Sequence, residues 1–118
     1  MNQNLSLTKQ FHERFEIPIS NQPAKLLKER YEFRYQFLKE EIEEYLEAAQ
    51  EKELDQIAKE LCDIQCVLYG AVLEHGLQDR FDEMYEEVMK SNMSKEKSGF
   101  KMVKGEEYRK ADLKQFLN

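Results

Sequence analysis

The sequence predicts an all-α protein: a four-helix bundle with a short irregular or hairpin-like segment at its C-terminal end. Apolar residues recur at three- and four-residue steps up to about residue 91, the spacing that places them on one face of a helix. The 118 residues include only four glycines and two prolines, so we expect few turns and long helices. A chain of this length has room for one domain, and we expect residues 1–118 to form a single one.

The helix boundaries follow from where the apolar stripes begin and end. Ile17 and Pro18 end the first stripe, and Ser20 with Pro23 looks like a cap and an early-turn proline for the second helix. Gly76 looks like a C-terminal stop for the third helix. The predicted helices cover about residues 5–15, 24–50, 53–75 and 78–91.

The pattern changes at Asn92. The helical stripe stops there, two of the four glycines follow, and basic residues alternate with apolar ones over residues 100–104. This segment predicts an ordered loop or a short hairpin. We expect it to end in a turn of helix near Leu113–Phe116.

The charges are unevenly distributed along the chain. The net charge is −6, which disfavours general binding to nucleic acid. Residues 40–63 carry ten acids and two lysines, a net of −8, whereas residues 90–110 carry seven bases and three acids, a net of +4. An acidic middle and a basic tail would suit a cation together with an anionic ligand. Two unrelated solvated surfaces would show the same distribution.

Nothing in the sequence indicates a membrane protein. No run of about 18 apolar residues is present, and the N-terminus lacks the basic start and apolar stretch of a signal peptide. We therefore expect a soluble cytoplasmic protein that binds no membrane. Cys62 and Cys66 lie four apart in a predicted helix, a poor geometry for a disulfide and a poor zinc motif. We expect them to be reduced residues of the core.

Two pairs of acidic residues are the candidates for a metal-binding site. Glu41 and Glu44 lie three apart on the second predicted helix, as Glu60 and Asp63 do on the third, so each pair projects from one helical face. If these helices pack antiparallel, the four carboxylates converge, and their mutual repulsion calls for a cation. Oxygen ligands select Mg²⁺, or else Mn²⁺, before zinc. Taken alone, the same residues also fit a solvated acidic surface.

A di-iron carboxylate bundle is a rival interpretation of the acidic helices. It requires a Glu-x-x-His pair on two helices. The two histidines, His12 and His75, are instead preceded three residues earlier by Lys9 and Val72, so this interpretation fails. We expect each histidine to be a surface or helix-end residue.

The acidic motif resembles that of a known group. Residues 40–44 read EEIEE, and residues 60–63 read ELCD after a gap of fifteen. This pattern resembles the EExxE and ExxD signature of the MazG-like all-α nucleoside triphosphate pyrophosphohydrolases, which are related to phosphoribosyl-ATP pyrophosphohydrolase and dimeric dUTPases. The stretches at residues 11–15, 91–95 and 104–113 also resemble one branch of this group. In that branch, a proline often replaces Glu106 or Ala111.

The resemblance implies a function and a set of site residues. The reaction would be Mg²⁺-dependent hydrolysis of a nucleoside triphosphate to the monophosphate and pyrophosphate. Glu40 would position or deprotonate the attacking water. The metal ligands would be Glu41, Glu44, Glu60 and Asp63, and the contacts to the phosphates or sugar would be Asn92, Lys95, Lys104, Tyr108 and Arg109.

The resemblance also implies a homodimer or a dimer of dimers, and aromatic residues point the same way. A single buried stripe on the second predicted helix cannot include Phe33, Tyr35 and Phe37 together, so in a single chain some of these aromatic side chains would stay uncovered. Two alternatives remain open at this level: a non-catalytic helical interaction protein, and a regulatory module that binds a nucleotide without turnover. For the predicted tail contacts, Asn92 could instead be a helix C-cap, and the bases could be solvated. No residue indicates which base is preferred.

Overall fold

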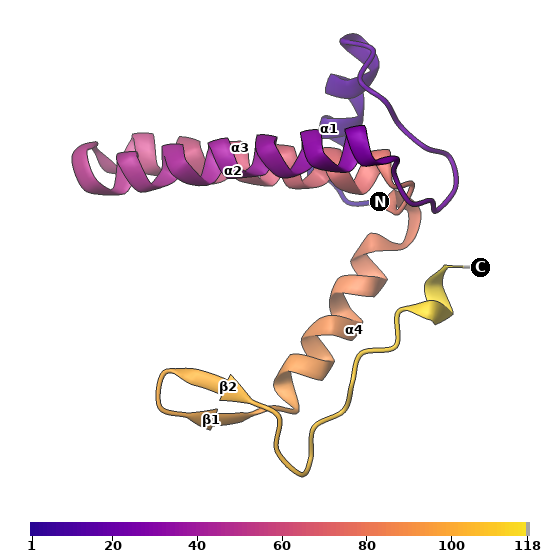
Figure 1. Cartoon of the computed structure of the whole chain (residues 1–118), viewed down its shortest axis with the longest axis vertical. Coiled ribbons are helices and arrows are strands. Elements are labelled where there is room, and N and C mark those ends of the chain that lie inside the picture. The colour runs from indigo at the N-terminus through magenta and orange to yellow at the C-terminus, as the bar shows by residue number, and fades with distance from the viewer. Residues whose placement is uncertain (118) are drawn as a thin grey trace. The chain divides into compact units, whose positions relative to one another are not determined.

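The computed structural model describes residues 1–117 and confirms the all-α prediction (Figure 1). Its described part has four α-helices, two short 3₁₀ helices and one two-stranded hairpin. None of the described helices is both long enough and apolar enough to cross a membrane. The elements are α1 (Gln3–Arg14), α2 (Lys28–Glu51), α3 (Leu54–Glu74), η1 (Gln78–Arg80), α4 (Phe81–Met93), β1 (Glu96–Ser98), β2 (Lys101–Val103) and η2 (Lys114–Phe116).

The chain divides into two compact units. Residues 2–78 form the helical unit, which contains α1, α2 and α3. Residues from Asp79 onward, with Met1, form the tail unit, which contains α4 and the hairpin. The expectation of one domain over residues 1–118 stays a prediction.

In the helical unit, α2 and α3 form an antiparallel pair, and α1 packs on α3 (Figure 1). Two extended residues, Lys52 and Glu53, join α2 to α3, at the break that the sequence predicts. Because the connection is so short, the two helices lie against each other along their length. The buried apolar core of this unit consists of Leu5, Ala48, Val67, Val72 and Leu73.

The start of α2 differs from the prediction. The helix begins at Lys28 rather than at residue 24, and Pro23 lies in an extended segment before it. The backbone N–H of Ser20 donates to the carbonyl of Leu73, and that of Ala24 donates to the carbonyl of His75, both at 2.9 Å. These bonds satisfy carbonyls at the end of α3 that have no partner inside their own helix. The segment therefore stays extended.

Gly76 ends α3 as predicted. Its φ is +70°, a backbone conformation that costs a residue with a Cβ about 1–2 kcal/mol. Its N–H donates to the carbonyl of Leu73 at 3.1 Å, and the N–H of Leu77 donates to that of Val72 at 3.0 Å, the Schellman pattern of a helix C-terminus. A Cβ at Gly76 would also collide with the carbonyl of Gln22. Only glycine fits this position.

A charged network is buried beside the core. The carboxylate of Glu74 is only 4% exposed and accepts hydrogen bonds from Nε of Arg30 and Nε of Arg34, each at 2.5 Å. Burial alone would raise the pKa of Glu74, but the two hydrogen bonds outweigh it and hold the pKa below its usual range. Replacing any single member of this triad would destabilise the fold, because the remaining charges would be buried without a partner.

The two histidines have different environments. His75 is the C-cap residue of α3, and its Nδ1 lies 2.8 Å from the carbonyl of Ala24, so the helix-end prediction is confirmed there. His12 is also near a helix end, in the last turn of α1, but it is not a surface residue, since it is 2% exposed and its Nδ1 lies 3.2 Å from the carbonyl of Pro18. Burial is the main reason that the pKa of His12 is lowered. The core-cysteine prediction is wrong for Cys62, which is free and exposed.

The tail unit contains the predicted hairpin and the final turn of helix. β1 and β2 are antiparallel, with Lys97 opposite Met102. Gly99, the first of the two loop residues, has a φ of +64°, as a two-residue type II′ turn requires. The 3₁₀ helix η2 covers residues 114–116, where a turn of helix was expected.

Candidate metal centre

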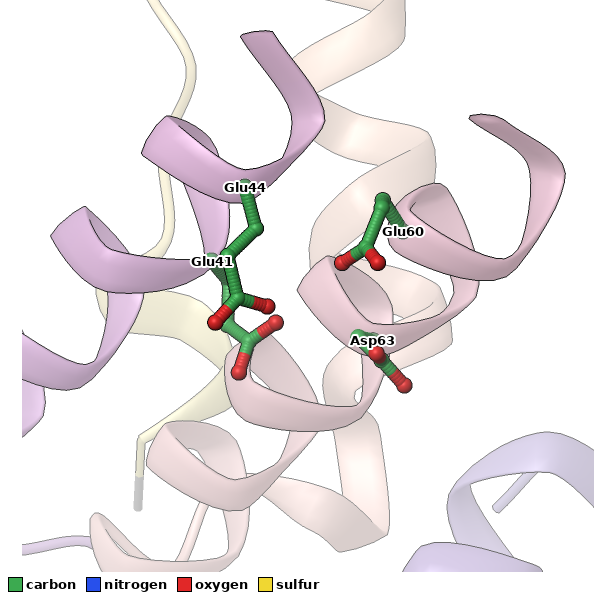
Figure 2. A group of neighbouring side chains, drawn as sticks. All are labelled: Glu41, Glu44, Glu60 and Asp63. Carbon is green, nitrogen blue, oxygen red and sulfur yellow. The ribbon is translucent and has the colours of Figure 1, made fainter. Parts of the chain in front are cut away.

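Two acidic pairs face each other across the α2–α3 contact (Figure 2). Glu41 and Glu44 project from α2, and Glu60 and Asp63 project from α3. One carboxylate oxygen from each residue lies within 4.8 Å of the other three. The spacing therefore brings the pairs together as expected, and their role as metal ligands stays a prediction.

The short connection sets this convergence. Glu44 is eight residues before Lys52, and Glu60 is seven residues after Glu53. In an antiparallel helical pair with a two-residue connection, positions at nearly equal distance from the turn lie at the same height. Glu41 lies about one turn farther from the connection than Glu44 on the same face of α2, and Asp63 lies about one turn farther from it than Glu60 on the same face of α3. The four carboxylates consequently form one layer between the helices.

Two of these carboxylates each have one buried oxygen without a hydrogen-bond partner among the described residues. Oε2 of Glu41 and Oε2 of Glu60 are inaccessible to solvent and accept no hydrogen bond within the described residues. Burial raises the pKa of Glu41, and the charges of Glu44 and Asp63 raise it further. Burial also raises the pKa of Glu60, against the opposing effect of Lys59. An ionised carboxylate in such a place is destabilising unless a cation accompanies it. The donor set and its burial fit a hard divalent ion.

Lys59 is a member of this site that the sequence prediction missed. Its Nζ lies 2.7 Å from Oδ2 of Asp63 and 3.9 Å from Oε1 of Glu60. The hydrogen bond with Asp63 is the main reason that the pKa of Lys59 is raised. The four-residue spacing of Lys59 and Asp63 on a predicted helix is a signal that could have indicated this pair.

Glu40, the predicted water-activating residue, lies next to this cluster in sequence but outside it. It is exposed on α2. With Phe33, Gln36 and Phe37 it lines a small cavity of about 220 Å³. Its role in proton transfer stays a prediction.

The predicted phosphate contacts all belong to the tail unit. Asn92 lies in the last turn of α4 and is exposed, and Ser94 rather than Asn92 is the C-cap of that helix. The alternative of Asn92 as a C-cap is therefore wrong. Lys95 and Lys104 form no ion pair with any carboxylate in the described chain, and Nζ of Lys104 lies 5.2 Å from the ring of Tyr108.

Arg109 and Asp112 fasten the tail to α4 and its C-cap, Ser94. Its Nη1 donates to Oε2 of Glu87 at 2.8 Å, and its backbone N–H donates to Oγ of Ser94 at 2.8 Å. Glu87 also accepts the backbone N–H of Asp112 at 2.9 Å. These bonds are the reason that the pKa of Glu87 lies below its usual range. A hydrogen bond with Ser91 likewise lowers the pKa of Tyr108. The tail is thus fastened along α4, and substrate contact by these residues stays a prediction.

An all-α fold with a four-carboxylate layer between two antiparallel helices defines a helical protein with a candidate divalent-metal site. A sequence model of the phosphoribosyl-ATP pyrophosphohydrolase family matches residues 8–92. This match covers more than half of the chain, so the protein belongs to that family, within the MazG-like nucleoside triphosphate pyrophosphohydrolase superfamily. No curated protein matches the chain.

Family membership confirms the resemblance read from the acidic motif. The family consists of pyrophosphohydrolases, hydrolases that act on a phosphoanhydride of a nucleotide and are of a metal-dependent type. The matched residues include both acidic pairs and Asn92, whereas Lys95 and the hairpin follow the end of the match.

Proposed function

We propose that this protein is a Mg²⁺-dependent pyrophosphohydrolase that cleaves a nucleoside triphosphate into the monophosphate and pyrophosphate. The observation that carries the proposal is the convergence of four carboxylate oxygens within 4.8 Å, in a chain of this family. Family membership supports a hydrolase of phosphoanhydrides, and the acidic layer supports a divalent cation as its cofactor.

Glu41, Glu44, Glu60 and Asp63 would hold the ion. All their ligand atoms are carboxylate oxygens, which favour Mg²⁺ with Mn²⁺ as a substitute. When bound, such an ion polarises phosphoryl oxygens and makes water a better nucleophile at neutral pH. The chain's own contribution is to hold four negative charges together and to keep two of the oxygens away from competing donors.

The remaining site residues would act on water and on the substrate. Glu40, exposed beside the acidic pairs, would position the attacking water and accept its proton. Asn92, Lys95, Lys104 and Tyr108 would contact the phosphates or the sugar. The guanidinium of Arg109 is already paired with Glu87, which favours a role in anchoring the tail beside those contacts.

We also propose a homodimer or a dimer of dimers. Many apolar side chains of the helical unit stay exposed in a single chain, including Leu27 at 82%, Leu54 at 77% and Ile42 at 53%. The apolar stripe predicted for the second helix is therefore largely uncovered. A second copy would bury it, as protein interfaces bury apolar surface.

A pyrophosphate-release assay tests the proposed activity. The purified protein should release pyrophosphate from at least one canonical, deoxy or modified nucleoside triphosphate with Mg²⁺, and a chelator should abolish the release. Glu41→Gln should lose most of this activity because it removes one charged ligand. Glu43→Gln is the matched control, since Glu43 is exposed on the same helix and outside the acidic layer.

The outcomes separate the candidate functions. Release by wild type and Glu43→Gln, with loss in Glu41→Gln, would support the proposed site. Nucleotide binding without release of pyrophosphate would favour a regulatory module instead. Full activity of Glu41→Gln at limiting Mg²⁺ would contradict the assignment of the metal ligands.

A further inference from the structure

Lys59 is the basic neighbour of the acidic layer on α3. Its ammonium Nζ lies 2.7 Å from Oδ2 of Asp63 and 3.9 Å from Oε1 of Glu60. The first distance is that of a hydrogen bond, and the second is too long for one. An ammonium group has three N–H donors. The contact with Asp63 uses one of them, which leaves two for another acceptor.

The acidic layer is open to solvent on the side of this lysine. Glu60 and Asp63 lie together on α3 (Figure 2). The exposed fraction of the side chain rises from 14% in Glu60 to 35% in Asp63 and 63% in Lys59. Lys59 therefore borders the opening, and a ligand that enters on this side would meet its ammonium group.

The charge of the layer explains why an anionic substrate needs a cation at this edge. When ionised, the four carboxylates carry a charge of −4, and a divalent ion held by them would leave −2. The ammonium of Lys59 reduces this remainder to −1. Since like charges at close range repel each other, the lysine lowers the repulsion that the layer exerts on the phosphates of a nucleotide.

The pair of Lys59 with Asp63 contributes little to the stability of the helix. The pair is exposed, so solvent screens it. A lysine that precedes its acidic partner by four residues is also the less favourable order of the two charges on a helix. An ammonium on a flexible four-carbon stem is a frequent ligand of phosphate. Turning the ammonium from Asp63 towards a phosphate would therefore cost the fold little.

We propose that Lys59 binds the pyrophosphate part of the substrate, its ammonium donating to a phosphate oxygen there. This inference rests on the proposed function. The pyrophosphate part carries most of the charge of a nucleoside triphosphate, and a cation beside it stabilises the charge that develops as this part leaves. Lys59 thereby adds a substrate contact within the helical unit to the predicted contacts of the tail unit.

Binding of pyrophosphate tests this contact without knowledge of the preferred base. Pyrophosphate is titrated by calorimetry into the protein at a fixed excess of Mg²⁺ and at moderate salt. Wild type should bind it, and Lys59→Met should bind it about ten- to a hundredfold more weakly, because a charge-assisted hydrogen bond is lost. Lys59→Arg keeps the charge and N–H donors and should retain most of the affinity. Lys52→Met, in the exposed connection, is the control and should match wild type.

The affinity for Mg²⁺ alone shows that the effect does not arise from loss of the ion. Removing the positive charge of Lys59 should make Mg²⁺ bind more tightly in the absence of pyrophosphate. The same substitution should therefore strengthen the binding of one ligand and weaken that of the other. Pyrophosphate affinity of Lys59→Met equal to that of wild type would overturn the contact. An equal loss in Lys52→Met would also overturn it, because the effect would then be one of general charge.

The results distinguish this inference from the proposed function. Pyrophosphate binding that depends on Lys59, without hydrolysis of any triphosphate, would support the contact while the proposed activity fails. Release of pyrophosphate from a triphosphate, with unchanged pyrophosphate affinity in Lys59→Met, would overturn the contact while the activity stands. A wild type that binds no pyrophosphate in the presence of Mg²⁺ would likewise overturn it.

Discussion

Nζ of Lys59 lies 2.7 Å from Oδ2 of Asp63. The side chain of Lys59 is 63% exposed, and an exposed pair of this kind contributes little to stability because solvent screens it. The lysine therefore acts as a weak internal counter-ion for one side of the acidic layer. A divalent ion bound by Asp63 would have to displace it or coexist with it.

Replacing Lys59 separates its two effects. Lys59→Met should bind Mg²⁺ several-fold more tightly, because one unit of positive charge near the ion disappears. Without metal the variant should be slightly less stable, because the acidic layer loses its counter-ion. Titration calorimetry and thermal unfolding with a chelator measure the two quantities. Lys52→Met, in the exposed connection between the helices, should change neither, and weaker Mg²⁺ binding by Lys59→Met would contradict the counter-ion role.

The pH dependence of stability should identify the buried carboxyls. The pKa values of Glu41 and Glu60 are raised in the folded state, so their contribution to the unfolding free energy is full below the unfolded pKa of about 4.3. It is lost as the pH rises through the folded pKa values. Without metal, Glu41→Gln should therefore gain stability over wild type as the pH rises from about 4 towards neutrality.

Urea unfolding of both proteins across this pH range, with chelator and with Mg²⁺, measures the difference. Mg²⁺ should reverse the order by stabilising wild type, since a ligand that binds only the folded state raises its stability. A pH-independent difference between the two proteins without metal would show that Glu41 titrates normally.

Lys95 tests the tail. If it contacts the triphosphate, Lys95→Ala should lower kcat/KM about ten- to a hundredfold, because a charge-assisted hydrogen bond contributes about 1.5–3 kcal/mol. Mg²⁺ affinity without nucleotide should stay nearly unchanged. Steady-state kinetics at moderate salt provide the measurement, with Lys97→Ala in β1 as the control for a solvated lysine. If Lys95→Ala had the kcat/KM of the wild type, Lys95 would be a solvated surface lysine and would make no contact with the substrate.

Glu16 is strained. It follows α1 with a φ of +55°, and the N–H of Ile17 donates to the carbonyl of His12 at 2.9 Å, so Glu16 holds the position where helices usually place glycine. Glu16→Gly should raise the unfolding free energy by about 1 kcal/mol. Urea unfolding measures it, and Glu13→Gly within α1 should lower stability by about 1 kcal/mol. Destabilisation by Glu16→Gly would mean that its side chain outweighs the backbone strain.

The exposed apolar side chains of α2 predict the mass in solution. Light scattering at micromolar concentration should give two or four times the chain mass of 14.2 kDa. Ile42→Glu, at a side chain that is 53% exposed in the single chain, should shift the mass towards the monomer because it introduces a charge into the interface. A monomeric mass in an active wild-type preparation would rule out the assembly.

The helices and the acidic pairs were predictable because their causes are local. A periodic stripe specifies a helix through its own residues, and Gly76 ends α3 through the backbone of its immediate neighbours. The three-residue spacing of Glu41 with Glu44, and of Glu60 with Asp63, places each pair on one face whatever the rest of the chain does.

Tertiary structure decided the features that depend on distant neighbours. Pro23 looks like the start of a helix, yet hydrogen bonds from its segment to the end of α3 hold it extended. His12 is buried, and Nη2 of Arg34 has no hydrogen-bond partner among the described residues, because three helices meet there and Glu74 occupies only part of the guanidinium. Spacing along the chain specifies which side chains share a helical face. Packing between helices decides which faces meet, which polar groups find partners, and where a cavity remains.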